Sequence, residues 1–174
     1  MNIELRRYRI KSDTIDGQIF IDGAKVCDCA ENAHHCLPPG EYQIIVHKCR
    51  HHARKMPVIC LEDNTREALV TGCTKGAAGL QSEGNTCLDG STLPPCDQCP
   101  KLPFVGNNTT MPLYCPQLCP GNGVYNRTDG AILVGKNLAP GCLSHPKSAF
   151  DNLYDRIRKN AERGNEITLT ITTL

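Results

Sequence analysis

The chain has 174 residues, a formal net charge of +1 and a hydrophobic content of 40%, and it contains no Trp. This length is enough for one domain with its own core, which must rely on Ile, Leu and Val. The balanced charge argues against nucleic acid or an anionic membrane as a partner. No apolar run approaches the roughly 18 residues of a membrane span, and the polar N-terminus lacks the apolar stretch of a secretory signal peptide.

The N-terminal third is predicted to form short strands. Apolar and polar residues alternate from Ile3 to Ile10, as in a half-buried strand. Asp22-Gly23 is a two-residue signal for a type I′ hairpin between two such segments. A turn at Pro38-Pro39-Gly40 precedes a further apolar segment. The predicted strands in this part cover residues 3–10, 18–21, 25–29, 42–47 and 56–61.

The segment 62–117 differs in composition from the rest of the chain. It is rich in Gly, Pro, Asn, Thr and Cys and has few large aliphatic residues. Loops this long are uncommon inside a compact domain unless they are functional or cross-linked. We therefore interpret 62–117 as a Cys-rich, loop-like insertion within a single domain of residues 1–174. No P-loop or Rossmann glycine pattern occurs, so the sequence indicates no nucleotide cofactor.

The C-terminal part predicts one helix and a final strand. Ser148 and Asp151 have the spacing of a capping box, and Gly164 is placed to end the helix in a left-handed conformation. Alternation of Ile and Leu with Thr over 167–172 then predicts a strand. The expected fold is mainly β (α+β): an antiparallel β domain with the C-terminal helix packed on it. The predicted buried face of the helix carries Phe150, Leu153, Tyr154 and Ile157.

Twelve cysteines are many for a chain of this length. Cys96-x-x-Cys99 and Cys115-x-x-x-Cys119 are separated by 15 residues, close to the spacing of two Cys pairs around one tetrahedral zinc ion. Disulfides are the competing interpretation, and each would stabilise the fold by about 2–4 kcal/mol. Zinc would suit a reducing cytoplasm, whereas disulfides would suit an envelope or a particle.

A second group of metal-ligating residue types lies in the N-terminal part. It comprises Cys27, Cys29, His34, His35 and Cys36. Cys27 and Cys29 are two positions apart on a predicted strand, so both face the same side. The group can therefore be interpreted either as a metal site or as packing within a core.

The segment 118–137 resembles the active-site segment of a family of small bacterial and phage proteins known as a domain of unknown function. In that family, a His precedes Pro-Gly-Asn, and a Cys follows a Gly-containing acidic turn and precedes Ile-Leu-Val-Gly. This His…Gly-Cys arrangement is similar to the catalytic motif of L,D-transpeptidases, which cut and rejoin peptidoglycan stems through a Cys thiolate. Here the motif positions are Cys119 in place of the His, Asp129, Gly130, and Ala131 in place of the Cys.

The resemblance implies a degenerate, non-catalytic L,D-transpeptidase-like module, because alanine offers no nucleophile. Such a module would be a phage or bacterial envelope-associated binding or structural protein. Peptidoglycan or a phage or envelope protein is its expected partner, without nucleic acid and without membrane insertion.

Three alternatives remain open. Ala131 could be an engineered substitution that disarms a Cys-dependent peptidoglycan-modifying enzyme. Another pair could do the chemistry, with Cys119 or Cys142 as nucleophile and His145 as base. The insertion could instead be a zinc-stapled module for protein interaction, in which zinc is the implied cofactor. The expected location depends on the state of the cysteines. Reduced cysteines would suit the bacterial cytoplasm, whereas disulfides would suit a phage particle or the envelope.

Overall fold

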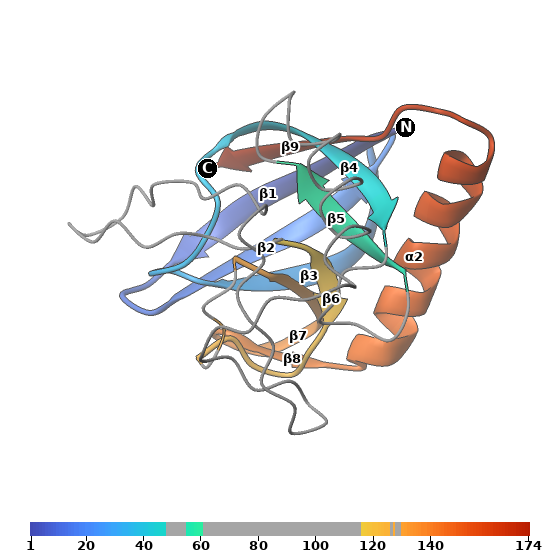
Figure 1. Cartoon of the computed structure of the whole chain (residues 1–174). Helices are drawn as coiled ribbons and strands as arrows, with labels where there is room; N and C mark the ends of the chain where they lie inside the picture. The colour runs from blue at the N-terminus through green and yellow to red at the C-terminus, as the bar shows by residue number, and fades with distance from the viewer. Residues whose placement is uncertain (48–54, 61–115, 126, 128–129) are drawn as a thin grey trace, which may run out of the picture.

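The structure, a computed structural model, describes residues 1–47, 55–60, 116–125, 127 and 130–174. Within these ranges, the chain forms nine strands and one helix (Figure 1). The strands are β1 (Asn2–Ile10), β2 (Thr14–Ile21), β3 (Ala24–Asn32), β4 (Gly40–His47), β5 (Met56–Cys60), β6 (Leu118–Pro120), β7 (Ile132–Ala139), β8 (Cys142–Ser144) and β9 (Thr168–Thr173), and the helix is α2 (Pro146–Glu162).

The strands form one mixed sheet that is nearly closed into a barrel. Their order is β5-β4-β9-β1-β2-β3-β7-β6, with β8 paired to β7. The two ends of this order approach each other, because Val58 of β5 forms a bridge with Gln117 and the Ile59 N–H donates to the Pro116 carbonyl. In Figure 1 the sheet curves around itself, and α2 lies along one side of it.

The β1–β2–β3 meander follows the predicted pattern. Ile3 and Leu5 of β1 are fully buried, whereas Glu4 and Arg6 are not. The β2–β3 connection is the expected two-residue hairpin, since Asp22 and Gly23 both have positive φ values, 49° and 82°. The inward-facing Ile3 and Leu5 of β1 pair with residues of β2 and supply one wall of the core.

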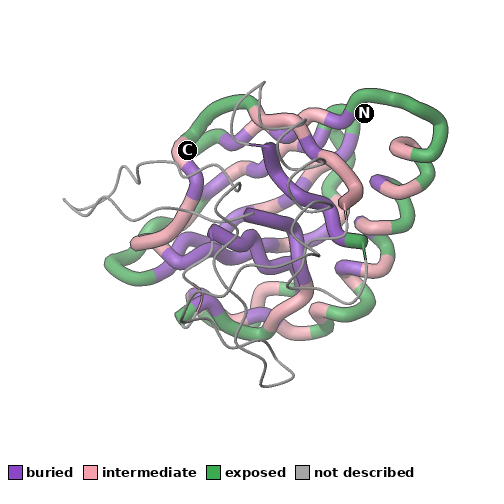
Figure 2. Tube along the Cα trace, viewed as in Figure 1, coloured by how far each residue is buried: buried purple, intermediate pink, exposed green. Residues whose placement is uncertain are grey.

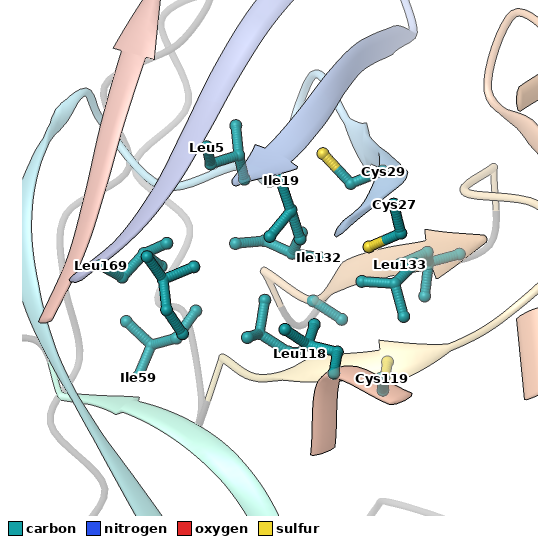
Figure 3. Packing of buried hydrophobic residues seen from close by; sticks show 14 of the residues in the cluster. Leu5, Ile19, Cys27, Cys29, Ile59, Leu118, Cys119, Ile132, Leu133 and Leu169 are labelled. Atoms are coloured by element: carbon teal, nitrogen blue, oxygen red, sulfur yellow. The ribbon is translucent and has the colours of Figure 1, made fainter. Parts of the chain in front are cut away.

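The core is aliphatic and contains several thiols. Figure 2 shows buried residues along every strand, with exposed residues concentrated in the turns and on the outer side of α2. In Figure 3, Cys27 and Cys29 of β3 point into the interior occupied by Leu5, Ile19 and Ile132. Both cysteines are therefore packing residues here, as one of the two sequence interpretations expected.

The helix α2 packs on the sheet through the predicted apolar face. Phe150, Leu153 and Ile157 are buried, and Tyr154 packs against them with partial exposure. The C-terminus is also as predicted: Gly164 has φ 75°, and its N–H and that of Asn165 return to carbonyls of the last turn.

The predicted capping box is wrong. The helix begins at Pro146 with His145 as N-cap, and the Ser148 hydroxyl donates to the His145 carbonyl instead of accepting a backbone N–H. Asp151 pairs with Lys147 within the helix at 2.6 Å. The physical reason is the proline, whose fixed φ and missing N–H suit the first helical position two residues before Ser148.

The mainly β fold with a C-terminal helix packed on it is confirmed. The sheet is mixed, however, because β9 pairs with β1 and β6 pairs with β7 in parallel. The insertion at 62–117 lies almost entirely outside the described residues, so its character stays a prediction. Among the described helical residues, none form a segment long and apolar enough to cross a membrane.

Candidate functional site

The structure brings Cys119 and Ala131 to one face of two neighbouring strands. β6 and β7 are parallel, and Cys119 pairs in register with Leu133. Ala131 immediately precedes β7, two residues before Leu133, so alternation places it on the same face as Leu133 and Cys119. The adjacent residues Leu118 and Ile132 take the opposite face, toward the barrel interior (Figure 3). The two motif positions that the resemblance singled out therefore share one face, and Ala131 lies two residues before the partner of Cys119.

Both positions are closed to solvent. Cys119 and Ala131 are each 3% exposed. A buried thiol in packed surroundings is chemically inert unless a neighbour favours its thiolate. Burial and the absence of a side chain beyond Cβ at Ala131 both disfavour a reaction at these two positions.

The guanidinium of Arg127 approaches Cys119. Nη2 of Arg127 lies 3.5 Å from Sγ of Cys119. The Arg127 backbone N–H donates to the Val124 carbonyl at 3.0 Å. A guanidinium beside a sulfur stabilises its thiolate form and also binds carboxylates. The sequence analysis did not single out Arg127.

Glycines allow the chain to fold closely around the site. Gly130 has φ 73°, a left-handed conformation that side chains disfavour, and it is buried directly before Ala131. A Cβ at Gly121 would lie 2.9 Å from both terminal methyls of Leu133. Asp129 of the motif lies outside the described residues.

The alternative pair, Cys142 and His145, is not joined by a hydrogen bond in the described part of the chain. Cys142 is half-buried at the start of β8 and forms a bridge with Gly123, in the loop that follows Cys119. His145 is exposed, has φ 51° and precedes the helix. Cys142 therefore lies beside the motif loop, whereas His145 serves as the backbone N-cap of α2.

Buried polar residues anchor the loop from the side of β2 and β3, and the sequence analysis missed them. The Asp16 side chain is fully buried and accepts the Gly141 N–H at 3.0 Å. The Asn32 side-chain amide donates to the Val124 carbonyl at 3.3 Å. These contacts span more than ninety residues of sequence, and an acidic or amide residue inside a strand gives no sequence signal of its own.

The candidate zinc ligands Cys96, Cys99 and Cys115 lie outside the described residues, and only Cys119 of that set is placed. Among the residues that the structure does describe, no group of three or more His, Cys, Asp or Glu side chains is arranged to hold a metal ion. The zinc and disulfide interpretations of the insertion both stay predictions.

The N-terminal group of cysteines and histidines is dispersed in the fold. Cys27, Cys29, Cys36 and Cys142 carry free thiols. Burial raises the pKa of Cys27 to about 12 and that of Cys36 to about 11, with nearby Asp28 and Glu31 adding to the respective shifts. Burial is the largest cause of both shifts, so these thiols behave as small packing residues in this part of the structure.

A buried ion pair lies at the barrel wall near these thiols. Arg7 and Glu31 are 3% and 2% exposed at their side chains, and two hydrogen bonds of 2.8 and 2.7 Å join them. Arg7 also donates to the Leu37 carbonyl at 2.7 Å, which fixes the loop after β3. Burial by itself would lower the Arg7 pKa, but the charge of Glu31 and its hydrogen bonds raise it. This pair is a structural feature on the inner face of the sheet.

Comparison of the chain with protein-family models, with curated proteins and with solved structures gave no match in any of the three.

Proposed function

We propose that this chain is a non-catalytic, degenerate L,D-transpeptidase-like module that binds peptidoglycan at a phage or bacterial envelope. The observation that carries the proposal is the shared face of Cys119 and Ala131 on β6 and β7. The two motif positions lie on one face, with Ala131 two residues before the partner of Cys119, yet one is alanine and both are buried. A motif that lacks its nucleophile but keeps its surrounding residues favours binding of peptidoglycan over its cleavage or cross-linking.

Arg127 supplies the chemistry for binding. Peptidoglycan stem peptides carry carboxylates, and a guanidinium binds a carboxylate through charge-assisted hydrogen bonds. Arg127 lies in the loop after β6, with its guanidinium 3.5 Å from the Cys119 sulfur, and is partly accessible. Exposed Tyr125 is two residues away and would add apolar contact to a bound stem.

Co-sedimentation of the full chain with purified peptidoglycan sacculi tests this function. We expect the native chain to sediment and the Arg127→Gln variant to bind about tenfold or more weakly, since a hydrogen bond to a charged group is worth about 1.5–3 kcal/mol. Lys147→Gln is the matched control. Lys147 is an equally charged side chain, 87% exposed and paired with Asp151 on α2, so its loss should leave binding unchanged. Failure of the native chain to sediment would refute the proposal.

The contact between Arg127 and Cys119 favours one alternative function, a Cys-dependent peptidoglycan-modifying enzyme. In that case the guanidinium would hold Cys119 as a thiolate nucleophile, or Cys142 would attack from the neighbouring β8. The alternative predicts new or lost stem cross-links when the chain is incubated with sacculi. It also predicts that Cys119→Ala or Cys142→Ala abolishes this change.

A further inference from the structure

The loop that carries Arg127 is connected to buried Asp16 of β2 by a continuous chain of hydrogen bonds. Asp16 Oδ1 accepts the Gly141 N–H at 3.0 Å, and the Gly141 carbonyl accepts the Val124 N–H at 3.2 Å. The Val124 carbonyl then accepts the Arg127 N–H at 3.0 Å. Nη2 of Arg127 ends the chain 3.5 Å from the Cys119 sulfur. The two middle links join backbone groups, and the two outer links end on the side chains of Asp16 and Cys119.

Asp16 is built to hold a fixed position. Its second oxygen accepts Nε of Arg9 at 2.7 Å, so the buried carboxylate has a cation as well as the Gly141 N–H. Thr14, two residues earlier, packs so closely on Gly141 that a Cβ there would lie 2.4 Å from the Thr14 methyl. The turn at Gly141 is therefore held by a hydrogen bond and by close packing at once.

Asn32 of β3 supports the same chain at its midpoint. Its side-chain amide donates to the Val124 carbonyl, while its oxygen accepts the His34 N–H at 2.9 Å. Val124 itself is fully buried. The Val124 carbonyl thus receives two donors, one from β3 and one from Arg127, and its orientation is fixed from both sides.

We propose that Asp16 is a positioning residue for the candidate site: through Gly141 and Val124 it sets where the Arg127 guanidinium stands relative to Cys119. This rests on the proposed function in so far as the Arg127–Cys119 pair is the binding site. The role requires the acceptor oxygen of Asp16 rather than its charge, because the link to the loop is a neutral backbone N–H.

The test measures the distance between Nη2 of Arg127 and Sγ of Cys119 in crystal structures of the reduced full-length chain and of its variants. In the native chain we expect the distance of 3.5 Å to be kept. In Asp16→Ala we expect the two atoms to separate beyond hydrogen-bonding distance, with the strands of the sheet in their native places. Asp16→Asn keeps one acceptor oxygen for the Gly141 N–H and should therefore keep the native distance.

Two further variants keep the test decisive. Asn32→Ala releases Val124 from the other side and should lengthen the distance between Arg127 Nη2 and Cys119 Sγ as Asp16→Ala does, even if the latter folds poorly. Ile157→Val loosens the core beneath α2 without touching the chain of hydrogen bonds, and it should leave this distance unchanged. The proposal is wrong if neither Asp16→Ala nor Asn32→Ala lengthens the distance, if Asp16→Asn lengthens it equally, or if Ile157→Val lengthens it too. Sacculus binding does not enter this readout, so a failure of the binding function is recognised separately.

Discussion

The buried ion pair between Arg7 and Glu31 gives the sharpest prediction about stability. Replacing Glu31 with Gln removes one charge and leaves the guanidinium of Arg7 buried, with its bond to the Leu37 carbonyl still in place. Removal of one partner from a buried pair costs about 3–5 kcal/mol, because the remaining charge has no counter-charge and no water. Glu31→Gln should therefore lose most of that amount.

Thermal unfolding followed by circular dichroism measures this loss. For a domain of this size, each kcal/mol lowers the melting temperature by about 2–4 °C, so we expect a drop of roughly 6–20 °C. The double variant Arg7→Met/Glu31→Leu removes both charges and should be much closer to native, although the Leu37 carbonyl then loses its donor at a cost of about 1–3 kcal/mol.

Asp151→Asn is the control for this measurement. Its partner Lys147 is 87% exposed and Asp151 itself is 43% exposed, and such surface pairs contribute only about 0.3–0.5 kcal/mol on a helix. The reasoning fails if Glu31→Gln costs no more than Asp151→Asn, or if the double variant is less stable than Glu31→Gln alone.

Two more predictions concern backbone shape and pH. Gly141→Ala should destabilise the fold by more than about 2 kcal/mol in urea titration, because it combines φ 69° with a Cβ 2.4 Å from the Thr14 methyl. Gly23→Ala is the control: Gly23 has φ 82° and open space around it, so this variant should lose only about 1–2 kcal/mol. Equal losses in the two variants would contradict this reasoning. The pKa of Cys27 is raised to about 12 from an ordinary 9.0, so the unfolded chain loses this proton at lower pH than the folded chain does. The free energy of unfolding should therefore be unaffected by Cys27 below pH 9 and fall by about 1.4 kcal/mol per pH unit from there to pH 12. Urea titrations of reduced protein at these pH values should show a shallower fall in Cys27→Ala than in the native chain.

The sequence predicted those elements whose burial is periodic. β1 alternates buried and exposed residues along its first half, and α2 buries one face at helical spacing, so both patterns were visible in the residues themselves. Asp22-Gly23 identified its hairpin because both residues tolerate positive φ. Each of these signals depends only on residues close together in the chain, so each can be recognised in a single sequence.

Features that depend on distant pairing were not predictable in this way. β6 and β8 each contain three residues, too few for any period, and they exist because β7 lies beside them. The parallel pairing of β1 with β9 joins the two ends of the chain. The capping box failed because a proline two residues earlier offered a better start for the helix.

The residues of the candidate site also fall into a group that the sequence predicted and a group that it did not. The motif pointed to Cys119 and Ala131, and the register of β6 with β7 places them on one face. Asp16 was missed because its contact with Gly141 joins segments 125 residues apart. Arg127 was missed because its contact with Cys119, only 8 residues away, is made from a loop that has no periodic pattern. Asp16 pairs with Arg9 of β1 and with Ala30 of β3, and a single sequence does not show this pairing.

The most direct test of the central proposal is the muropeptide composition of sacculi incubated with the reduced, native full-length chain and then analysed by mass spectrometry. The account predicts that the chain sediments with the sacculi and that the proportions of cross-linked and uncross-linked stems are the same as in sacculi incubated without it. Formation or loss of stem cross-links that depends on the native chain would contradict a non-catalytic role. A chain that neither binds nor changes the sacculi would contradict the peptidoglycan assignment itself.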